Sequence, residues 1–235
     1  MKLLHDFTGK LFESLLQLVY PPICISCNRL IREATPIRQL CPNCLGNFQP
    51  IPQELVRTSI LRRLDFANIN EILVAAQFDE RLQAVIHYFK YRRMNNLAFR
   101  IANYLKTYLQ GYLASQNIDL VFPVPLHPAR VKERGYNQSA YIARGLFDGS
   151  NTPVVCGILI RVRQTESQTR LNREERRLNV SGAFQLLQTE ILAGKTIALV
   201  DDVITTGATM NECARVLKEG NAKRIVGVAL SSPLD

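Results

Sequence analysis

From residue 71 onwards, runs of aliphatic residues alternate with stretches of helical periodicity. The aliphatic runs predict strands at 71–78, 119–126, 153–161, 196–201 and 224–231. They are apolar on consecutive positions rather than on alternate ones, which is typical of a parallel sheet covered by helices on both faces. The sequence therefore predicts an α/β fold, in which ligands bind at the carboxyl ends of the strands.

The segments between these strands predict helices at 81–91, 95–113, 137–147 and 208–220, because their apolar residues recur at a spacing of three or four. Ahead of the first strand, residues 47–70 are polar and irregular, which predicts a linker or a covering segment. Such a chain has no internal repeat and no low-complexity tract, so one sheet with flanking helices accounts for most of its length.

Two CxxC pairs, CISC and CPNC, precede the α/β region. Because the chain has no secretory signal, disulfide bonds between them are disfavoured by a reducing compartment. Two-residue spacing lets both thiolates of a pair face one ion, and two pairs complete a tetrahedral zinc site that leaves no position open for catalysis. A redox role is the alternative, but redox motifs occur singly. The predicted ligands of a structural zinc ion are Cys24, Cys27, Cys41 and Cys44. The two other cysteines, Cys156 and Cys213, are expected to be buried small hydrophobes.

The N-terminal residues 1–22 combine apolar positions at helical spacing with charges of both signs, which predicts an amphipathic helix packed on the protein. Charged residues interrupt the apolar run, so it is neither a secretory signal nor a transmembrane segment. We therefore expect a cytoplasmic protein without stable membrane insertion. Its predicted parts are a helix and zinc module at 1–50 and an α/β domain at 51–235.

The charge balance is basic, with 29 Lys and Arg against 20 Asp and Glu and a net charge of +9. Such an excess favours anionic partners such as phosphates or nucleic acid, although solubility alone also explains it. Hydrophobic residues make up 47% of the chain, which is typical of a folded globular protein and excludes a disordered one.

The stretch IALVDDVITTGAT at 197–209 places two acids at the end of a buried strand. One of them would cap the following helix in the simplest interpretation. That accounts for only one carboxylate, and adjacent like charges repel unless something binds them. Asp201 and Asp202 suit two neighbouring hydroxyls of a ribose, or a Mg²⁺ ion held by oxygen ligands.

The loop after the acids leads into a helix and offers an anion site. Exposed N–H groups and the positive end of the helix dipole attract a phosphate, and Gly207 allows close approach of the backbone. Hydroxyl donors come from Thr205, Thr206 and Thr209. Acids for a ribose beside a cradle for its 5′-phosphate predict a phosphorylated pentose as the ligand.

The same stretch resembles the signature of type I phosphoribosyltransferases, which bind phosphoribosyl pyrophosphate (PRPP) with Mg²⁺. The resemblance implies that Asp201 and Asp202 hold the ribose hydroxyls and supply negative field near the reacting carbon. It implies that the 5′-phosphate lies on Thr205, Thr206, Gly207, Ala208 and Thr209. In that family a loop after the second strand takes the pyrophosphate, which assigns His127 and Arg130 to that role here.

Further segments resemble the ComF family over nearly the whole chain. They are VFPVPLHPARVKERGYNQSA, the arm beginning RQTESQTRLNREERR, the KY pair after an aromatic helix, and the cysteine module. Members of this family are implicated in handling incoming single-stranded DNA during natural transformation. The resemblance thus implies PRPP, single-stranded DNA and competence or DNA-processing proteins as partners.

Several residues near the predicted pocket have two interpretations. Lys132 fits a solvated basic turn, whereas Arg134 fits a ligand or nucleic-acid contact at a strand end. The arginine-rich arm at 161–177 fits a lid over the site or a surface for single strands. Tyr136 and Tyr141 fit base stacking, although tyrosines at helical spacing are more often packed.

The sequence does not decide whether the chain is an enzyme, because no residue stands out as a general base for an acceptor. Three hypotheses remain open. The chain is an active phosphoribosyltransferase of nucleotide or base metabolism, a PRPP-binding protein that handles single-stranded DNA without turnover, or a zinc-braced DNA-binding module that retains an old pocket.

Overall fold

The computed structural model describes residues 21–61, 68–165 and 173–233 and divides the chain into two compact units, Met1–Phe48 and Gln49–Asp235. The helix predicted within residues 1–22 lies outside the described residues, except for its last two positions, 21 and 22. No helix of the described part is long and apolar enough to cross a membrane.

The described part of the first unit consists of two turns and a short helix. An antiparallel bridge joins Ile23 to Leu30, and the N–H of Asn28 donates to the Cys24 carbonyl at 2.8 Å, which closes the first turn. Helix α2 (Pro42–Gly46) follows the second turn, and the Sγ atom of its N-cap Cys41 accepts a hydrogen bond from the Cys44 N–H at 3.4 Å. Both CxxC pairs therefore lie in tight turns.

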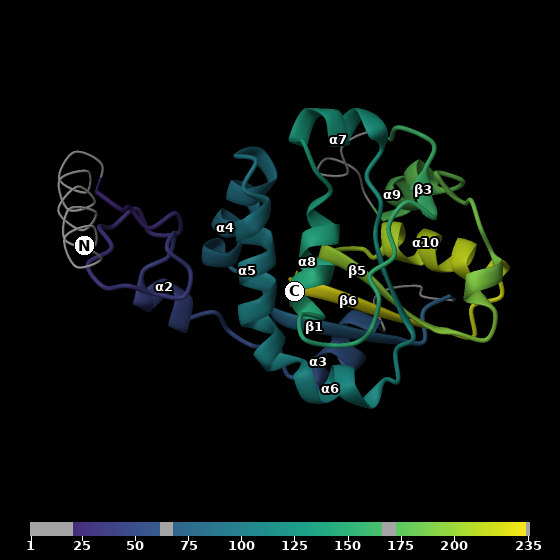
Figure 1. Cartoon of the computed structure of the whole chain (residues 1–235), viewed down its shortest axis with the longest axis horizontal. Helices are drawn as coiled ribbons and strands as arrows, with labels where there is room; N and C mark the ends of the chain where they lie inside the picture. The colour runs from purple at the N-terminus through teal and green to yellow at the C-terminus, as the bar shows by residue number, and fades with distance from the viewer. Residues whose placement is uncertain (1–20, 62–67, 166–172, 234–235) are drawn as a thin grey trace, which may run out of the picture. The chain divides into compact units, whose positions relative to one another are not determined.

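The second unit contains a parallel sheet, and the α/β prediction is confirmed (Figure 1). Within the described residues its four strands run in the order β1–β6–β5–β2, every neighbouring pair parallel. A separate antiparallel pair is formed by β3 and β4. The strands are β1 (Glu71–Gln77), β2 (Leu120–Pro123), β3 (Leu159–Arg161), β4 (Phe184–Leu186), β5 (Thr196–Val203) and β6 (Arg224–Ser232).

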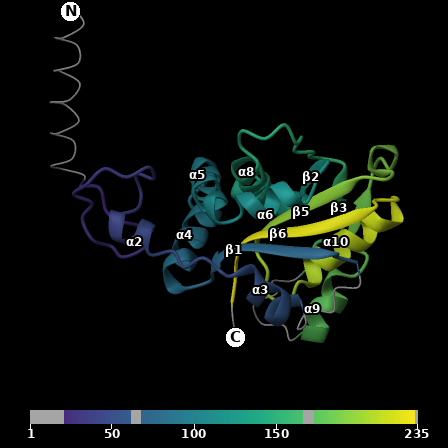
Figure 2. The same ribbon diagram turned by 90° about the horizontal axis from the view of Figure 1, so that it is seen from below.

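Helices cover both faces of this sheet, as Figure 2 shows, with α5 and α8 on one face and α10 on the other. The first turns are stabilised by side-chain caps: Asp79 accepts from the Leu82 N–H at 2.9 Å, and Asn137 from the Ser139 N–H at 3.1 Å. The longer helices are α4 (Glu80–Tyr91), α5 (Asn95–Leu105), α8 (Gln138–Leu146), α9 (Arg173–Val180) and α10 (Ala208–Glu219). The short ones are α3 (Gln53–Leu55), the π-helix η1 (Val56–Leu61), η2 (Lys106–Tyr108), α6 (Gln110–Ser115), α7 (Pro128–Arg134) and η4 (Glu190–Leu192).

Close packing of α5 against α8 depends on one glycine. A Cβ atom on Gly145 would lie 2.4 Å from the Phe99 carbonyl oxygen and 2.8 Å from the Ala102 Cβ. Distances below 3.0 Å do not occur between real atoms of these kinds, so no larger residue fits without moving a backbone. Gly145 therefore fixes how near the two helices approach.

Three predictions from periodicity are wrong. Residues 153–161 do not form one strand: Val154 makes an isolated bridge to Val121, Gly157 turns the chain at φ +83°, and β3 begins only at Leu159. Cys156 is consequently exposed instead of buried. The helix predicted over 95–113 is broken into α5, η2 and α6. Cys213, by contrast, is fully buried on α10 as expected.

Both outer strands of the sheet have a covered edge. The segment before α3 runs along β1, where Ile51 donates its N–H to the Ala75 carbonyl at 3.3 Å. The buried Gln53 side-chain amide completes this contact, since it donates to the Val74 carbonyl at 2.8 Å and accepts from the Val74 N–H at 3.2 Å. On the other side, the Val155 N–H donates to the Val121 carbonyl of β2 at 2.8 Å. The described part of segment 47–70 is thus a covering segment.

Candidate functional site

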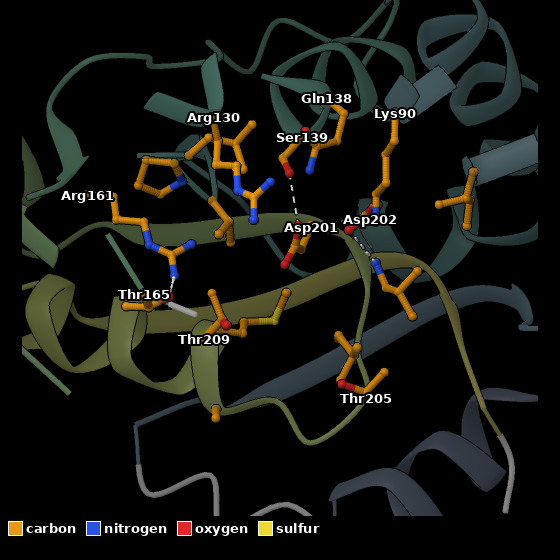
Figure 3. Close-up of a pocket in the computed structure, with 18 of the residues that line it drawn as sticks. Lys90, Arg130, Gln138, Ser139, Arg161, Thr165, Asp201, Asp202, Thr205 and Thr209 are labelled. Carbon is orange, nitrogen blue, oxygen red and sulfur yellow. Dashed lines mark hydrogen bonds and ion pairs between the residues drawn. The ribbon is translucent and has the colours of Figure 1, made fainter. Parts of the chain in front are cut away.

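A cavity of about 540 Å³ lies where β2 and β5 end, and Figure 3 shows the side chains that line it. Its walls come from α4, the β2–α7 connection, the first turn of α8, the end of β3, α9 and the β5–α10 loop. The carboxyl ends of parallel strands are where α/β proteins bind ligands. The residues that carry the predicted chemistry and line this cavity are Asp201, Asp202, Thr205, Thr206, Gly207, Ala208, Thr209, His127 and Arg130.

The two acids of β5 have different partners. The Oδ1 atom of Asp201 accepts hydrogen bonds from the Ser139 hydroxyl and the Asp202 N–H, each at 2.9 Å. The Asp202 carboxylate is buried and forms an ion pair with the ammonium group of Lys90 from α4. Figure 3 shows the two carboxylates diverging, with the Asp201 group facing the cavity and the Asp202 group facing Lys90.

Neither acid caps the following helix, because the N-cap residue of α10 is Gly207. The simplest interpretation of the acid pair is therefore wrong. Burial raises the pKa of Asp201 to about 7, and the neighbouring charge of Asp202 adds to the effect, while the Asp202 N–H, Lys90 and Ser139 act in the opposite direction. A carboxyl group with such a pKa is poised to lose its proton when a cation or a hydrogen-bond donor arrives.

The β5–α10 loop presents open backbone donors. Gly207 adopts φ +67°, a left-handed conformation that glycine reaches without strain, and no side chain caps the start of α10. The Oγ1 atom of Thr206 is buried without a hydrogen-bond partner. Unpaired N–H groups at a helix start together with a buried free hydroxyl make an anion site. The exposed Thr205 hydroxyl lies 3.4 Å from the nearer guanidinium nitrogen of Arg176.

Arginines face the acids from the other walls. The guanidinium of Arg161 bonds the Thr165 hydroxyl and lies 5.3 Å from the Phe184 ring centroid, yet its Nε–H is buried without a partner. Burial lowers the pKa of Arg161, although the charge of Asp201 works against this. Arg134 bonds the Gln138 side chain at 3.0 Å, and its Nε–H is likewise buried and unpaired. Buried donors without acceptors are unfavourable, so an anionic ligand would satisfy both groups.

The residues predicted after β2 form the short helix α7 instead of an open loop. His127 is its N-cap, and its Nδ1 atom accepts from the Ala129 N–H at 3.3 Å, so the proton of a neutral ring sits on Nε2. Arg130 lines the cavity but forms an ion pair with Glu133 at 2.8 Å. Lys132 is exposed and does not line the cavity, as its interpretation as a solvated basic residue requires.

Of the two predicted stacking tyrosines, Tyr136 is buried and Tyr141 is partly buried. Tyr136 is 8% exposed, donates its hydroxyl to the Phe89 carbonyl, and has a pKa raised to about 12 by burial. Tyr141 packs edge-on against it at 5.4 Å between ring centroids and accepts from the Asn95 side chain at 2.9 Å. Burial excludes base stacking on Tyr136. The partly buried Tyr141 ring is contacted by Tyr136 and by the Arg144 guanidinium, which favours the packed interpretation for it as well.

The sequence did not single out three polar residues of the cavity: Lys90, Gln138 and Ser139. All three lie on helices whose apolar periodicity explains their neighbours. That periodicity gives no hint that Lys90 and Ser139 contact a strand 60 or more residues away, or that Gln138 accepts from Arg134. Lys90 belongs to the KY pair at the end of α4, which the sequence marks only as a feature of the ComF resemblance. Of the arm, Arg161, Arg163, Arg176 and Arg177 are described, whereas Arg170 and the Arg173 side chain lie outside the described residues.

The four predicted zinc ligands come together in the first unit. Their Sγ atoms all lie within 4.8 Å of one another, and those of Cys27 and Cys41 are 3.8 Å apart. Zn–S bonds of about 2.3 Å in a tetrahedron place sulfurs about 3.8 Å apart. The cluster therefore has the dimensions of a metal site.

Comparison with known proteins defines the class of the second unit. A family description, "Phosphoribosyl transferase domain", matches residues 131–232, which include the acid pair and the β5–α10 loop. The chain is 29% identical to "Competence protein F" of Haemophilus influenzae over 66% of this chain and 70% of that protein. It is 28% identical to "DNA utilization protein YhgH" of Escherichia coli O157:H7 over 86% and 87%. It is 28% identical to "Competence protein ComFC" of Bacillus subtilis over 88% and 83%.

The family model includes the acid pair and the β5–α10 loop, and two of these relatives match more than four fifths of this chain. The named relatives and the phosphoribosyl transferase domain together support a ComF-family phosphoribosyltransferase-like protein.

Proposed function

We propose that the cavity binds PRPP with Mg²⁺ and that the protein serves natural competence by handling incoming single-stranded DNA in the cytoplasm. PRPP binding is supported by a set of buried hydrogen-bond donors that have no partner and that line the same cavity as the acid pair. Thr206 Oγ1 and the Nε–H groups of Arg134 and Arg161 have no partner, and all three residues line the cavity that Asp201 lines. Anionic phosphates on a hydroxyl-bearing sugar satisfy both sides at once.

The ligand's sugar end fits the acids. Asp201 keeps one carboxylate oxygen on Ser139 and presents the other to the cavity, where a ribose hydroxyl can donate to it. Lys90 holds Asp202 in place and offsets part of the negative charge that two adjacent carboxylates create. The 5′-phosphate would then lie on Thr206 and at the N-terminus of α10, which has no side-chain cap.

The pyrophosphate end fits the basic wall. Arg161 presents an unpaired donor there, and His127 offers an Nε2–H from the start of α7. Mg²⁺ would be held chiefly by the pyrophosphate and the ribose hydroxyls beside Asp201, and when bound it would neutralise charge on the leaving group. The Asp201 carboxylate in the cavity wall is a hard oxygen ligand of the kind that this ion prefers.

Support for the competence role comes from the relatives, two of which are named for competence and one for DNA utilization. The basic net charge of +9 agrees with a polyanionic partner. We further propose that zinc occupies the four-cysteine cluster and stabilises the first unit, because four thiolates close the coordination sphere.

Calorimetric titration of PRPP with Mg²⁺ tests the proposal. We expect binding to the wild type, none to Asp201→Asn, and binding weakened by about 10-fold or more in Thr206→Val, since a hydrogen bond to a charged group contributes about 1.5–3 kcal/mol. The matched control is Thr107→Val on η2, whose exposed hydroxyl donates to the Tyr104 carbonyl of the preceding helix α5 and does not line the cavity. An absence of binding to the wild type would contradict the proposal.

Pyrophosphate release distinguishes turnover from binding alone. Release that requires both Mg²⁺ and an added nucleobase or nucleotide would make the chain an active phosphoribosyltransferase. Binding without release would identify a PRPP-binding protein. DNA binding that is indifferent to Asp201→Asn and to PRPP would instead favour a basic module with an unused pocket.

A further inference from the structure

One exposed aromatic ring stands at the rim of the cavity. Tyr91 is the last residue of α4, its side chain is 56% exposed, and it lines the same cavity as the acid pair. The His87 ring lies 4.5 Å away, centroid to centroid, and the Arg134 guanidinium carbon lies 5.6 Å from the Tyr91 centroid. At this distance the guanidinium lies over the ring within the range of a cation–π contact, and the exposed fraction of Tyr91 is the part of the ring left open to a ligand.

We propose that Tyr91 is a stacking platform for a base of single-stranded DNA, held at the mouth of the cavity between His87 and Arg134. Aromatic rings stack on any base because every base has a π-face, and guanidinium groups add a cation–π contribution. No other described tyrosine combines exposure with a place on this cavity.

The backbone of such a strand would find cations on both sides of Tyr91. Arg92 and Arg93 follow it and are exposed, and Lys132 is exposed on α7. The two segments meet, since the Arg93 side chain lies 3.9 Å from where a Cβ on Gly135 would stand. The acid on this part of α7, Glu133, is already paired with Arg130 and leaves the positive charge of the rim uncompensated.

Single strands fit this rim better than duplex DNA, because a base must leave its neighbours to lie on an isolated ring. A free nucleobase or mononucleotide has the same ring chemistry but gains nothing from Arg92, Arg93 and Lys132 beyond one phosphate. We therefore assign the platform to a polynucleotide. The single strand as ligand and the place of its base next to a sugar phosphate both rest on the proposed function, whereas the exposure of Tyr91 and the positive charge around it do not.

Fluorescence anisotropy of a labelled twelve-nucleotide oligothymidylate measures the contribution of the ring. We expect Tyr91→Ala to weaken binding by about 10-fold, a typical loss for one base–aromatic stack, and Tyr91→Phe to bind within about 2-fold of the wild type. The matched control is Tyr112→Ala on α6, which removes a 45% exposed tyrosine that does not line the cavity. Equal affinity of Tyr91→Ala and the wild type, or an equal loss in Tyr112→Ala, would overturn the proposal.

Two further readouts separate stacking from a general loss of structure or charge. Tyr91→Ala should leave the slope of log affinity against log salt unchanged, whereas Arg93→Gln should lower its magnitude by about one. An oligonucleotide carrying one 5-iodouracil should crosslink to Tyr91 or His87 on irradiation, and an adduct confined to other peptides would refute the platform.

Two controls show which part of the proposal a negative result would contradict. If thymidine monophosphate displaces the oligonucleotide at an equal concentration of nucleotide, the site is one for free nucleotides and the assignment to a strand is wrong. PRPP calorimetry on the wild type is independent of every DNA measurement, so loss of the platform and loss of the proposed function are distinguishable.

Discussion

The raised pKa of Asp201 predicts that PRPP binding is coupled to proton release. The carboxyl ordinarily ionises at a pKa of 3.8, and burial next to Asp202 raises that value to about 7. A ribose hydroxyl donates to the carboxylate but not to the neutral acid's proton-bearing oxygen, so binding selects the ionised form. At pH 6 about one tenth of the free protein carries the carboxylate, and at pH 8 about nine tenths do. Affinity should therefore rise about 10-fold between pH 6 and 8, or about 1.4 kcal/mol, and level off above.

Calorimetry in two buffers of different ionisation enthalpy measures the protons released. At pH 7 the wild type should release about 0.5 proton from Asp201, against about 0.1 from a ligand phosphate whose second pKa is about 6. Lys90→Met removes the ammonium group that lowers the pKa of Asp201, so it should move the pH dependence upward. Affinity that is flat from pH 6 to 8, with no proton release beyond the phosphate's own, would refute the argument.

The free protein should show the reverse trend in stability. A carboxyl group whose pKa is raised on folding binds a proton more tightly in the folded state than in the unfolded one. Its contribution to stability is therefore present at low pH and is lost as the pH rises from 3.8 to about 7.

Two more predictions concern the fold. Gly145→Ala should lower the midpoint of thermal unfolding by several degrees, a loss of about 1–3 kcal/mol in stability, because its Cβ would clash with the Phe99 carbonyl. The control is Gly111→Ala on α6, whose Cβ meets nothing within 4 Å and which should leave the midpoint unchanged. Equal effects of the two substitutions would contradict the packing argument. Cys24→Ser and Cys41→Ser should each release zinc and unfold the first unit, as followed by metal analysis and proteolysis, and a wild-type protein that carries no zinc and resists strong chelation would refute the zinc site.

The sequence predicted most of the sheet because its central strands are apolar at consecutive positions. β5 and β6 are buried on both faces, so their composition alone identifies them. The failure at 153–161 has a physical reason: the stretch is equally apolar, but Gly157 at φ +83° divides it between two sheets. Hydropathy does not reveal a change of backbone direction. For the same reason the sequence predicted a buried Cys156, which is exposed in the structure.

For the candidate site, the sequence predicted the residues that share one loop and missed those that meet only in space. The acid pair and the TTGAT loop are contiguous, so their chemistry could be read directly. Lys90 and Ser139 reach the acids from separate helices. The sequence marks Tyr91 only as part of the KY pair and gives no sign of its exposure, because helical spacing does not tell which tyrosine a neighbouring helix leaves uncovered.

The covered edges of the sheet protect the protein from aggregation at high protein concentration. An open strand edge offers a row of unpaired N–H and C=O groups to any other chain, and is a template for aggregation. Here the Gln53 side chain imitates a neighbouring strand along β1, and Val155 closes β2. Replacing Gln53 by a residue without an amide would expose the Val74 backbone, and self-association into insoluble particles could then follow without any loss of the sugar-phosphate pocket.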